Sequence, residues 1–351
     1  MARADLVKKI LGALRSPWVR GLFLVAAIGA AVLAVANQWD IVVDSLSQMP
    51  WWIVVVGLLV SVLYVVATML SWREVLIDLG SRLGLAPAAR LFFVSQVGKY
   101  LPGGVWNIVA AAEMGKDIDI PRRRSVSGMV VSLLVSIVTG LALAAGAVAF
   151  DPAVRSEVGW VVWFLPVFVV VLLPPVLNRI LGVALKLIRR PPLEHPLSAR
   201  GVLRASSWAI VGWLLAGLQV WLIATAVGLD PTLGTFARAV SGYALAWVVG
   251  FLVVIVPAGV GVRESILGIM LAGLLSGGGV LVTILMSRVL LTVVDLALGL
   301  GTGVLVRRHA PQGAAEVAVD EAGPVPVDEA GPVPADGTGS VPADGDGQPE
   351  R

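Results

Sequence analysis

Cysteine is absent from this 351-residue chain, so a disulfide, a thiolate nucleophile and a thiolate metal ligand are all excluded. Charge is also scarce, because only 14% of the residues are Asp, Glu, Lys or Arg while 58% are hydrophobic. The two histidines, His195 and His309, lie far apart and form no metal-ligand cluster. The chain lacks the phosphate-binding motif G-x-x-x-x-G-K-[ST]. We therefore expect no metal site, no cofactor, no ATP-driven step and no enzymatic activity.

Long apolar runs are what the sequence does have. A helix of about 20 apolar residues crosses the hydrocarbon core of a bilayer, and several charge-free runs reach that length. The fold class predicted is therefore all-α, a polytopic bundle of transmembrane helices. The expected spans are 19–37, 51–71, 125–150, 159–178, 207–228 and 280–306. Within 159–178, Pro166 and Pro174-Pro175 predict a kink.

The charges at the ends of these runs predict the orientation. The N-terminal segment 1–18 is basic, and positive flanks stay in the cytoplasm, so the first helix should run outward. Ala34-Val35-Ala36 resembles a signal-peptidase site, but further spans follow it, and we interpret 19–37 as an uncleaved helix. The last span ends at Arg307-Arg308. We therefore predict a plasma-membrane protein with both termini in the cytoplasm and a membrane domain over 19–308.

The C-terminal segment has a different composition. Residues 310–351 hold nine acidic residues and one basic residue, so the rest of the chain carries 25 Lys and Arg against 14 Asp and Glu. The sequence Val-Asp-Glu-Ala-Gly-Pro-Val-Pro occurs at 319–326 and again at 327–334. A segment this rich in Pro, Gly and acid predicts a disordered cytoplasmic tail over 309–351. An interaction arm for a basic partner is the alternative.

Cations flank both sides of the apolar stretch 91–111. Arg90 precedes this stretch and Lys116 follows it, so it cannot make one simple crossing. Two interpretations remain. One is a re-entrant hairpin that enters from the cytoplasm and folds back at Pro102-Gly103-Gly104, where glycine permits a tight turn. The other is an amphipathic helix on the inner surface.

A second proline–glycine break lies in residues 231–279. The apolar helix expected at 239–256 is followed by Pro257-Ala258-Gly259-Val260-Gly261 and then by a short helix at 265–275. The span 207–228 is predicted to end outside and the span 280–306 to start outside. The segment between them must therefore cross the membrane an even number of times. Two broken hairpins separated by three spans allow an inverted arrangement like that of many transporters.

Both breaks lie beside cations and are followed by a helix start. Broken backbone and ionised side chains are costly in hydrocarbon, so they persist where they line a cavity or bind a ligand. The first amides of a helix attract anions, and in a bilayer the abundant anion is the lipid phosphate. The predicted phosphate-binding residues are Lys99, Arg263, Arg288, Gly103, Gly104, Gly259 and Gly261. The predicted headgroup contacts are Tyr100, Trp106 and Asn107, and the predicted helix breaks are Pro102 and Pro257.

Three acidic residues are the expected charge partners: Glu113, Glu264 and Asp295. Arg288 and Asp295 are seven residues apart on one helix and should therefore share a face. The alternative role of these charges is structural. Arg263 and Glu264 would then lie at an interface, and Arg288 with Asp295 would pair with Glu113 or Lys99 as buried ion bridges that hold helices together.

The chain resembles the lysylphosphatidylglycerol synthase transmembrane-domain family, which is described as flippase-like. The resemblance rests on three segments in matching order: Ser95–Trp106, Val256–Glu264 and Ser287–Thr292. It implies a role in moving a lipid between leaflets, and by similarity it marks Lys99, Pro102, Gly103, Pro257, Gly259, Arg263, Glu264 and Arg288. Many members carry an acid in the helix after the first basic loop, whereas 125–150 here has Ser132 and Ser136 instead.

We therefore predict a lipid transporter that takes a phosphate-bearing headgroup, from a phospholipid or a polyprenyl-phosphate-linked lipid, in a cavity between the broken hairpins. Its partners would be membrane lipids, not nucleic acid. The alternative is a non-catalytic membrane scaffold or partner subunit for a lipid- or glycan-modifying enzyme.

Overall fold

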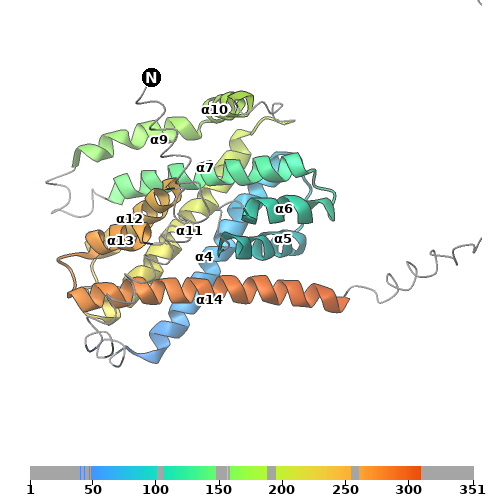
Figure 1. The fold of residues 1–351 in the computed structure, drawn as a ribbon. Helices are drawn as coiled ribbons and strands as arrows, with labels where there is room; N and C mark the ends of the chain where they lie inside the picture. Colours follow the sequence, from blue (N-terminus) through green and yellow to red (C-terminus); the bar gives the residue numbers. More distant parts are fainter. Residues whose placement is uncertain are drawn as a thin grey trace, which may run out of the picture. The chain divides into compact units, whose positions relative to one another are not determined.

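The computed structural model describes residues 49–100, 106–147, 159–187, 195–253 and 261–309, together with positions 40, 43, 47 and 156. The described segments are helical and are joined by short turns (Figure 1). The helices are α4 (Trp51–Asp78), α5 (Leu85–Val97), η1 (Gly98–Tyr100), α6 (Trp106–Lys116), α7 (Arg122–Ala147), η3 (Gly159–Phe164), α9 (Leu165–Leu172), α10 (Pro174–Leu187), α11 (Ala199–Ala226), α12 (Leu233–Leu252), α13 (Val262–Leu271) and α14 (Gly277–His309).

The prediction of a polytopic helical bundle is confirmed. Within the described residues, five helices are long and apolar enough to cross a membrane: α4, α7, α11, α12 and α14. Four of them overlap predicted spans, although α11 begins eight residues before the predicted start at 207. The helix α12 begins six residues before the predicted start at 239. The reason is a capping box, in which Thr232 and Thr235 each accept the other's backbone N–H at 3.1 Å. The first predicted span, 19–37, and the segment 1–18 lie outside the described residues.

The predicted single span at 159–178 is divided. Its two parts, Val162–Leu172 and Pro174–Val183, meet at an angle of 75°. Leu173 is extended, with ψ of 131°, because a residue that precedes proline is disfavoured in the helical conformation. Figure 1 shows α9 from the side and α10 nearly end-on. The prolines therefore end one helix and start another, which is more than the predicted kink.

Two pairs of short helices correspond to the predicted broken hairpins. At 1.5 Å per residue, α5 and α6 are about 20 and 16 Å long, so neither spans a core of about 30 Å. The two helices pack against each other, which fits the re-entrant hairpin and not a single surface helix. In the second pair, α13 packs on α12 and is about 15 Å long. The turns themselves, 101–105 and 254–260, lie outside the described residues.

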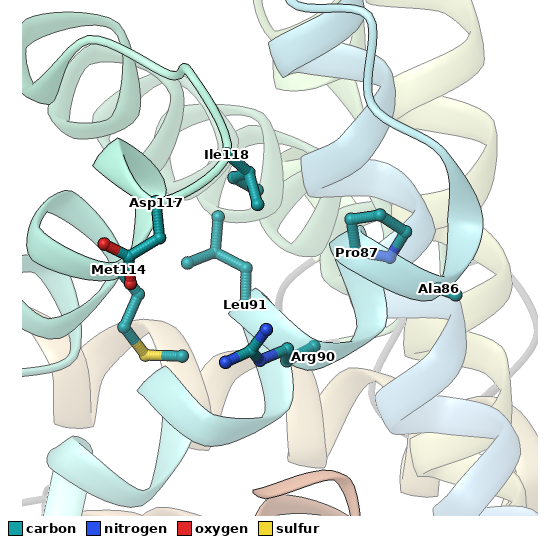
Figure 2. Close-up of a pocket in the computed structure, with 7 residues that line it drawn as sticks. All are labelled: Ala86, Pro87, Arg90, Leu91, Met114, Asp117 and Ile118. Carbon is teal, nitrogen blue, oxygen red and sulfur yellow. The ribbon is translucent and has the colours of Figure 1, made fainter. Parts of the chain in front are cut away.

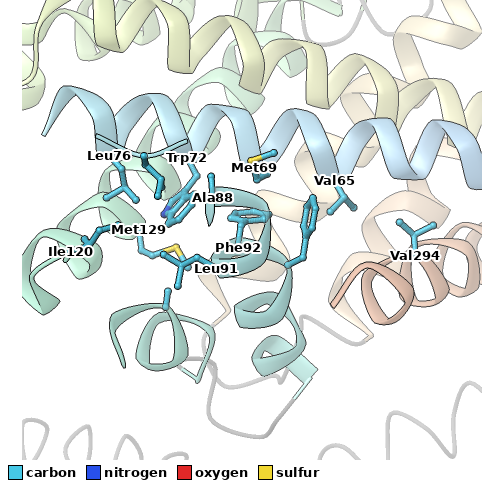
Figure 3. Close-up of a cluster of buried hydrophobic side chains, with 13 residues drawn as sticks. Val65, Met69, Trp72, Leu76, Ala88, Leu91, Phe92, Ile120, Met129 and Val294 are labelled. Atoms are coloured by element: carbon cyan, nitrogen blue, oxygen red, sulfur yellow. The ribbon is translucent and has the colours of Figure 1, made fainter. Parts of the chain in front are cut away.

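A buried cluster fixes the first hairpin against α4 (Figure 3). Trp72 of α4 contacts Phe92 of α5 with ring centroids 5.4 Å apart, and Phe92 contacts Phe93 edge-on at 6.0 Å. Val294 of α14 belongs to the same cluster. The packing thus sets the end of α5, and with it η1, close to α14.

Candidate functional site

The first break brings Lys99 beside the start of α6. A Cβ built on Gly98 would lie 2.8 Å from the backbone nitrogen of Asn107, so only glycine permits this approach. The carbonyl carbon of Trp106 is equally close to that position. The backbone therefore places Lys99 close to the start of α6, as the sequence predicted. Pro102, Gly103, Gly104 and the side chain of Tyr100 lie outside the described residues, while Trp106 is exposed.

Lys99 forms an ion pair with a buried carboxylate of α14. The Nζ of Lys99 lies 2.6 Å from an Oδ of Asp295. The side chain of Asp295 is 4% exposed, whereas that of Lys99 is 36% exposed. One turn further along α14, Gly299 packs against Val97 and against the carbonyl of Phe93. This close contact between α14 and α5 places the acid against the lysine.

The second break is followed by a second ion pair. Gly261 has φ of 86°, a left-handed conformation that favours glycine, and it precedes the first residue of α13. One oxygen of Glu264 accepts the Gly261 N–H at 2.6 Å, and the other accepts from Nε of Arg288 at 2.5 Å. Glu264 therefore joins the start of α13 to α14. Pro257 and Gly259 lie outside the described residues.

Arg263 is held by an aromatic ring and a glycine of α12. Its guanidinium carbon lies 5.4 Å from the centre of the Trp247 ring, a cation–π contact. A Cβ on Gly250 would lie 2.5 Å from Cγ of Arg263, so this glycine makes room for the side chain. The Nε of Arg263 and one Nη of Arg288 are buried, and neither has a hydrogen-bond acceptor among the described residues.

A pair of tyrosines lies near these charges. Tyr64 of α4 and Tyr243 of α12 meet edge-on with centroids 6.1 Å apart. Both tyrosines lie within electrostatic range of Arg263 and of Asp295. Arg288 and Asp295 are seven residues apart, which corresponds to about 10 Å along α14. The predicted cations thus lie at two levels along α14, with Arg263 and Arg288 at one and Lys99 at the other, and Lys99 and Arg263 contact different partners.

Sequence reasoning missed the aromatic lining of this region. Tyr243, Trp247 and Phe251 recur every four residues along one face of α12, and Trp247 stacks on Phe251 at 5.6 Å. Trp213 of α11 meets Trp247 edge-on at 5.3 Å. The spacing was visible in the sequence, but within an apolar run it does not distinguish a site from ordinary packing.

A second group that was missed is a neutral network of three buried side chains. Gln219 of α11 donates to the hydroxyl of Ser61 of α4 at 2.7 Å, and Ser287 of α14 donates to the Gln219 carbonyl oxygen at 2.7 Å. All three residues are at most 2% exposed. Interhelical hydrogen bonds of this kind fix helices to one another in lipid. The network therefore joins α4, α11 and α14.

The structure places Glu113 apart from the Lys99–Asp295 and Arg288–Glu264 ion pairs. Its carboxylate is exposed and contacts Arg122 at 2.5 Å and Lys116 at 2.6 Å. The reason is local, because Lys116 ends α6 and Arg122 starts α7. Hydrogen bonds from Arg122 and Lys116 lower the pKa of the Glu113 carboxyl, and the bond from Arg122 has the larger effect.

This lowered pKa predicts a small effect of pH on stability. A carboxyl whose pKa is lower in the folded state stabilises the fold above its unfolded pKa, about 4.3, and loses this contribution as the pH falls through the lowered value. We expect Glu113→Gln to lower the melting temperature slightly at neutral pH and not in acid. Melting curves from pH 7 to pH ~3 check this. Asp117→Asn, an equal charge change at an exposed position nearby, is the control and should show no such trend. A constant difference between Glu113→Gln and the wild type at every pH would contradict the assignment.

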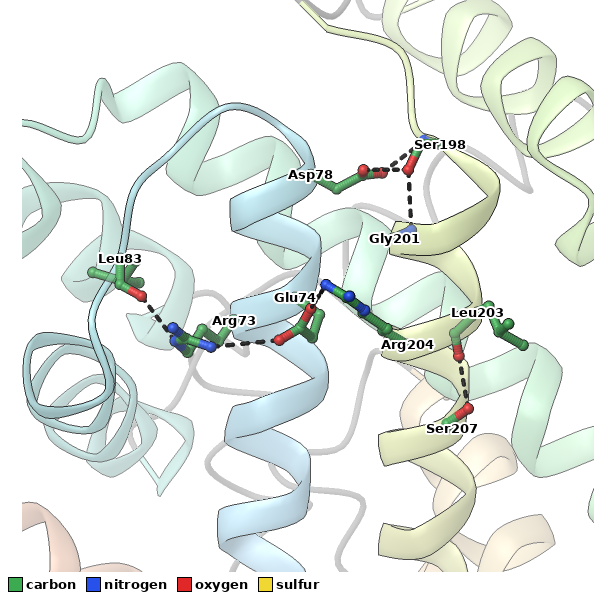
Figure 4. Close-up of polar contacts among 9 residues, drawn as sticks. All are labelled: Arg73, Glu74, Asp78, Leu83, Ser198, Gly201, Leu203, Arg204 and Ser207. Atoms are coloured by element: carbon green, nitrogen blue, oxygen red, sulfur yellow. Dashed lines mark hydrogen bonds and ion pairs between the residues drawn. The ribbon is translucent and has the colours of Figure 1, made fainter.

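The ends of α4 and α11 are joined by polar contacts at the predicted cytoplasmic side (Figure 4). Asp78 accepts from the backbone N–H of Ser198 at 2.7 Å and from its hydroxyl at 2.6 Å. The Ser198 hydroxyl in turn accepts from the N–H of Gly201 and so caps α11. Glu74 lies 3.8 Å from Arg204 across the same pair of helices. These contacts hold the frame against which the hairpins pack.

A pocket of about 270 Å³ lies between α5 and α6 (Figure 2). Its lining is apolar except for one guanidinium and one carboxylate. The lining residues are Ala86, Pro87, Arg90, Leu91, Met114, Asp117 and Ile118. None of them is among the residues predicted to bind phosphate, and the pocket has no excess charge of either sign.

Five apolar helices, two broken hairpins and paired charges inside the helical region define a multi-pass membrane protein with a polar interior site. The chain belongs to the family described as lysylphosphatidylglycerol synthase TM region, whose model matches residues 21–299. The match covers both breaks and all of the paired charges described above. This confirms the resemblance and makes the chain a membrane protein of the flippase-like kind. A comparison with curated proteins gave no match.

Proposed function

We propose that this protein is a lipid transporter, not an enzyme, and that it binds a phosphate-bearing headgroup beside Arg263 and Arg288. The observation that carries the proposal is the charge of this group. Two guanidinium groups lie within electrostatic range of each other, and Glu264 is the carboxylate that accompanies them. Among the described residues, the group therefore has one excess positive charge. An excess charge in a membrane interior is costly and points to an ionic ligand.

A phosphate fits the available donors. The Nε of Arg263 and an Nη of Arg288 are buried and have no acceptor among the described residues. Guanidinium donors match the oxygens of a phosphate in geometry and charge. Gly261 has no side chain to cap α13, so the first amides of that helix are further donors. A phosphodiester with a single negative charge would neutralise the excess.

Lys99, at the second level, would provide a second binding position for the headgroup. Lys99 of η1 is partly exposed and pairs with Asp295, which lies about 10 Å further along α14 than Arg288. Tyr64 and Tyr243 lie within electrostatic range of Arg263 and of Asp295. A headgroup could pass from one position to the other while its acyl or prenyl chains stay in the lipid. The predicted orientation places Lys99 nearer the cytoplasm than Arg288. We also propose the plasma membrane as the location, with the basic segments of the chain facing the cytoplasm.

Transport by reconstituted protein tests the proposal. In proteoliposomes with fluorescent phosphatidylglycerol, we expect Arg263→Ala with Arg288→Ala to slow exchange between leaflets about tenfold or more, since a charge-assisted hydrogen bond contributes about 1.5–3 kcal/mol. Arg200→Ala, an exposed arginine at the start of α11, is the matched control and should transport normally. Folding is checked by melting temperature.

Normal transport by the folded double variant would overturn the proposed site. If the wild type moved no lipid, and deleting 310–351 abolished recovery of a lipid- or glycan-modifying enzyme, the scaffold interpretation would replace it.

A further inference from the structure

We infer that α10 is an interfacial helix, which lies in the headgroup layer of the membrane and binds anionic phospholipids through Arg179 and Lys186. The inference is independent of the proposed transport site, because α10 contributes no residue to it. It begins from the direction of the helix. The segments Val162–Leu172 and Pro174–Val183 meet at 75°, and Figure 1 shows α7, α9 and α14 from the side but α10 nearly end-on. With 14 residues, α10 is about 21 Å long and too short to span a core of about 30 Å.

Contacts with the ends of two spanning helices place α10 at a membrane surface. The amide of Asn178 donates to the carbonyl of Leu197 at 3.0 Å and accepts its backbone N–H at 2.9 Å. Leu197 lies two residues before α11. Leu177 and Leu181 of α10 belong to the same buried cluster as Leu79, the residue that follows α4. The end of α4 and the start of α11 are on the predicted cytoplasmic side, so α10 lies at that surface.

The opposite side of α10 carries an apolar stripe next to a basic one. Ile180 and Val183 are 38% and 63% exposed. Arg179 and Lys186 are also exposed, and α10 has no acidic residue. At about 100° per residue, the two cations lie about 170° from the buried leucine pair and about 80° from the exposed apolar pair. A helix with this arrangement can lay its apolar stripe among acyl chains and its cations among headgroups.

An anionic phospholipid fits both stripes at once. Its acyl chains would cover Ile180 and Val183, and its phosphate oxygens would accept hydrogen bonds from Arg179 and Lys186. A lipid without net charge would cover the apolar stripe equally well but would leave the two positive charges unbalanced. The predicted cytoplasmic position agrees with this choice, since that leaflet has a negative surface potential that attracts Lys and Arg.

The absence of cysteine allows a direct test of depth. Val183→Cys and Gly182→Cys each carry one spin label on the full-length protein in proteoliposomes, at positions about 100° apart around α10. A Cβ at Gly182 meets nothing within 4 Å, so a label fits there. We expect oxygen, which dissolves in acyl chains, to relax the label at Val183 more than a water-soluble nickel chelate does, with the reverse at Gly182.

Two outcomes of this measurement would overturn the inference. The same preference at both positions would place α10 wholly in water or wholly in hydrocarbon. A label at Val183 that is shielded from both reagents would mean that protein, either a second copy of the chain or a partner, covers the apolar stripe.

Quenching by brominated lipids tests the preference for anionic headgroups. A fluorescent label replaces the spin label on Val183→Cys, and phosphatidylcholine vesicles contain a small fraction of either dibrominated phosphatidylglycerol or dibrominated phosphatidylcholine. We expect phosphatidylglycerol to be enriched beside the label about fivefold or more, since one cation near the surface contributes about that factor. Arg179→Gln with Lys186→Gln should remove the enrichment. Arg200→Gln, an exposed arginine at the same predicted surface, is the matched control and should keep it.

Equal quenching by the two brominated lipids, or an enrichment that survives the double substitution, would show that these cations do not bind anionic lipid. Melting temperatures check that the variants fold. The enrichment in the Val183→Cys protein should also fall at high salt, and this measurement decides the matter if the double variant does not fold. None of these readouts depends on transport, so a failure here leaves the proposed site at Arg263 and Arg288 untouched.

Discussion

Reversing the charge of Lys99 or of Asp295 alone should destabilise the protein by about 3 kcal/mol, and reversing both should recover most of that loss. Each single reversal places two like charges where the Nζ and Oδ atoms are now 2.6 Å apart, next to a carboxylate position that is 4% exposed. The double variant, Lys99→Asp with Asp295→Lys, restores opposite charges. Melting temperatures of the four proteins in detergent form a double-mutant cycle that isolates the pair.

The surface pair of Lys116 and Glu113 is the matched control. Its partners are exposed and also lie 2.6 Å apart, so Lys116→Glu and Glu113→Lys should each change the melting temperature far less than the reversals at Lys99 and Asp295. If the double reversal of Lys99 and Asp295 melted no higher than its single variants, the ion pair would not be what fixes η1 to α14.

A single methyl group at Gly217 should also lower the melting temperature clearly. A Cβ at this position of α11 would lie 2.6 Å from the Cα of Val240 in α12, and backbone cannot move aside as a side chain can. We expect Gly217→Ala to cost about 1–3 kcal/mol through overpacking, in spite of the better helix propensity of alanine. Thermal unfolding in detergent measures the change.

The same substitution at Gly182 should have the opposite effect on stability. It lies inside α10, and a Cβ there would meet nothing within 4 Å. Gly182→Ala should therefore raise stability by up to about 1 kcal/mol, because alanine favours a helix. A loss of stability at Gly182 equal to that at Gly217 would show that the contact between α11 and α12 is not the cause.

The sequence predicted the parts of the fold that depend on local composition. The long apolar runs at 51–71, 125–150, 207–228 and 280–306 correspond to α4, α7, α11 and α14, since one helix must satisfy its own backbone in lipid. A helix does start after each break, at Trp106 and at Val262. The angle at Leu173–Pro174 could not be predicted, because a proline pair is compatible with both a kink and a complete break.

The pairing of charges depends on contacts between distant segments, which the sequence does not show. Heptad spacing predicted that Arg288 and Asp295 share a face of α14. The sequence left both Glu113 and Lys99 open as partners of Asp295, and the packing of α5 against Gly299 decides for Lys99. The three residues of the Gln219 network are likewise hidden, because single polar residues in apolar runs carry no pattern.

The charges of α14 have a consequence for how this helix responds to voltage. Between Gly277 and Thr302 it carries one positive and one negative side chain, Arg288 and Asp295. A displacement of the helix along the membrane normal therefore moves opposite charges by the same distance and gives no net gating charge. A single unpaired charge crossing the membrane would be subject to about 2.3 kcal/mol per 100 mV. The helix that connects both broken hairpins can thus shift between positions without work against the resting potential.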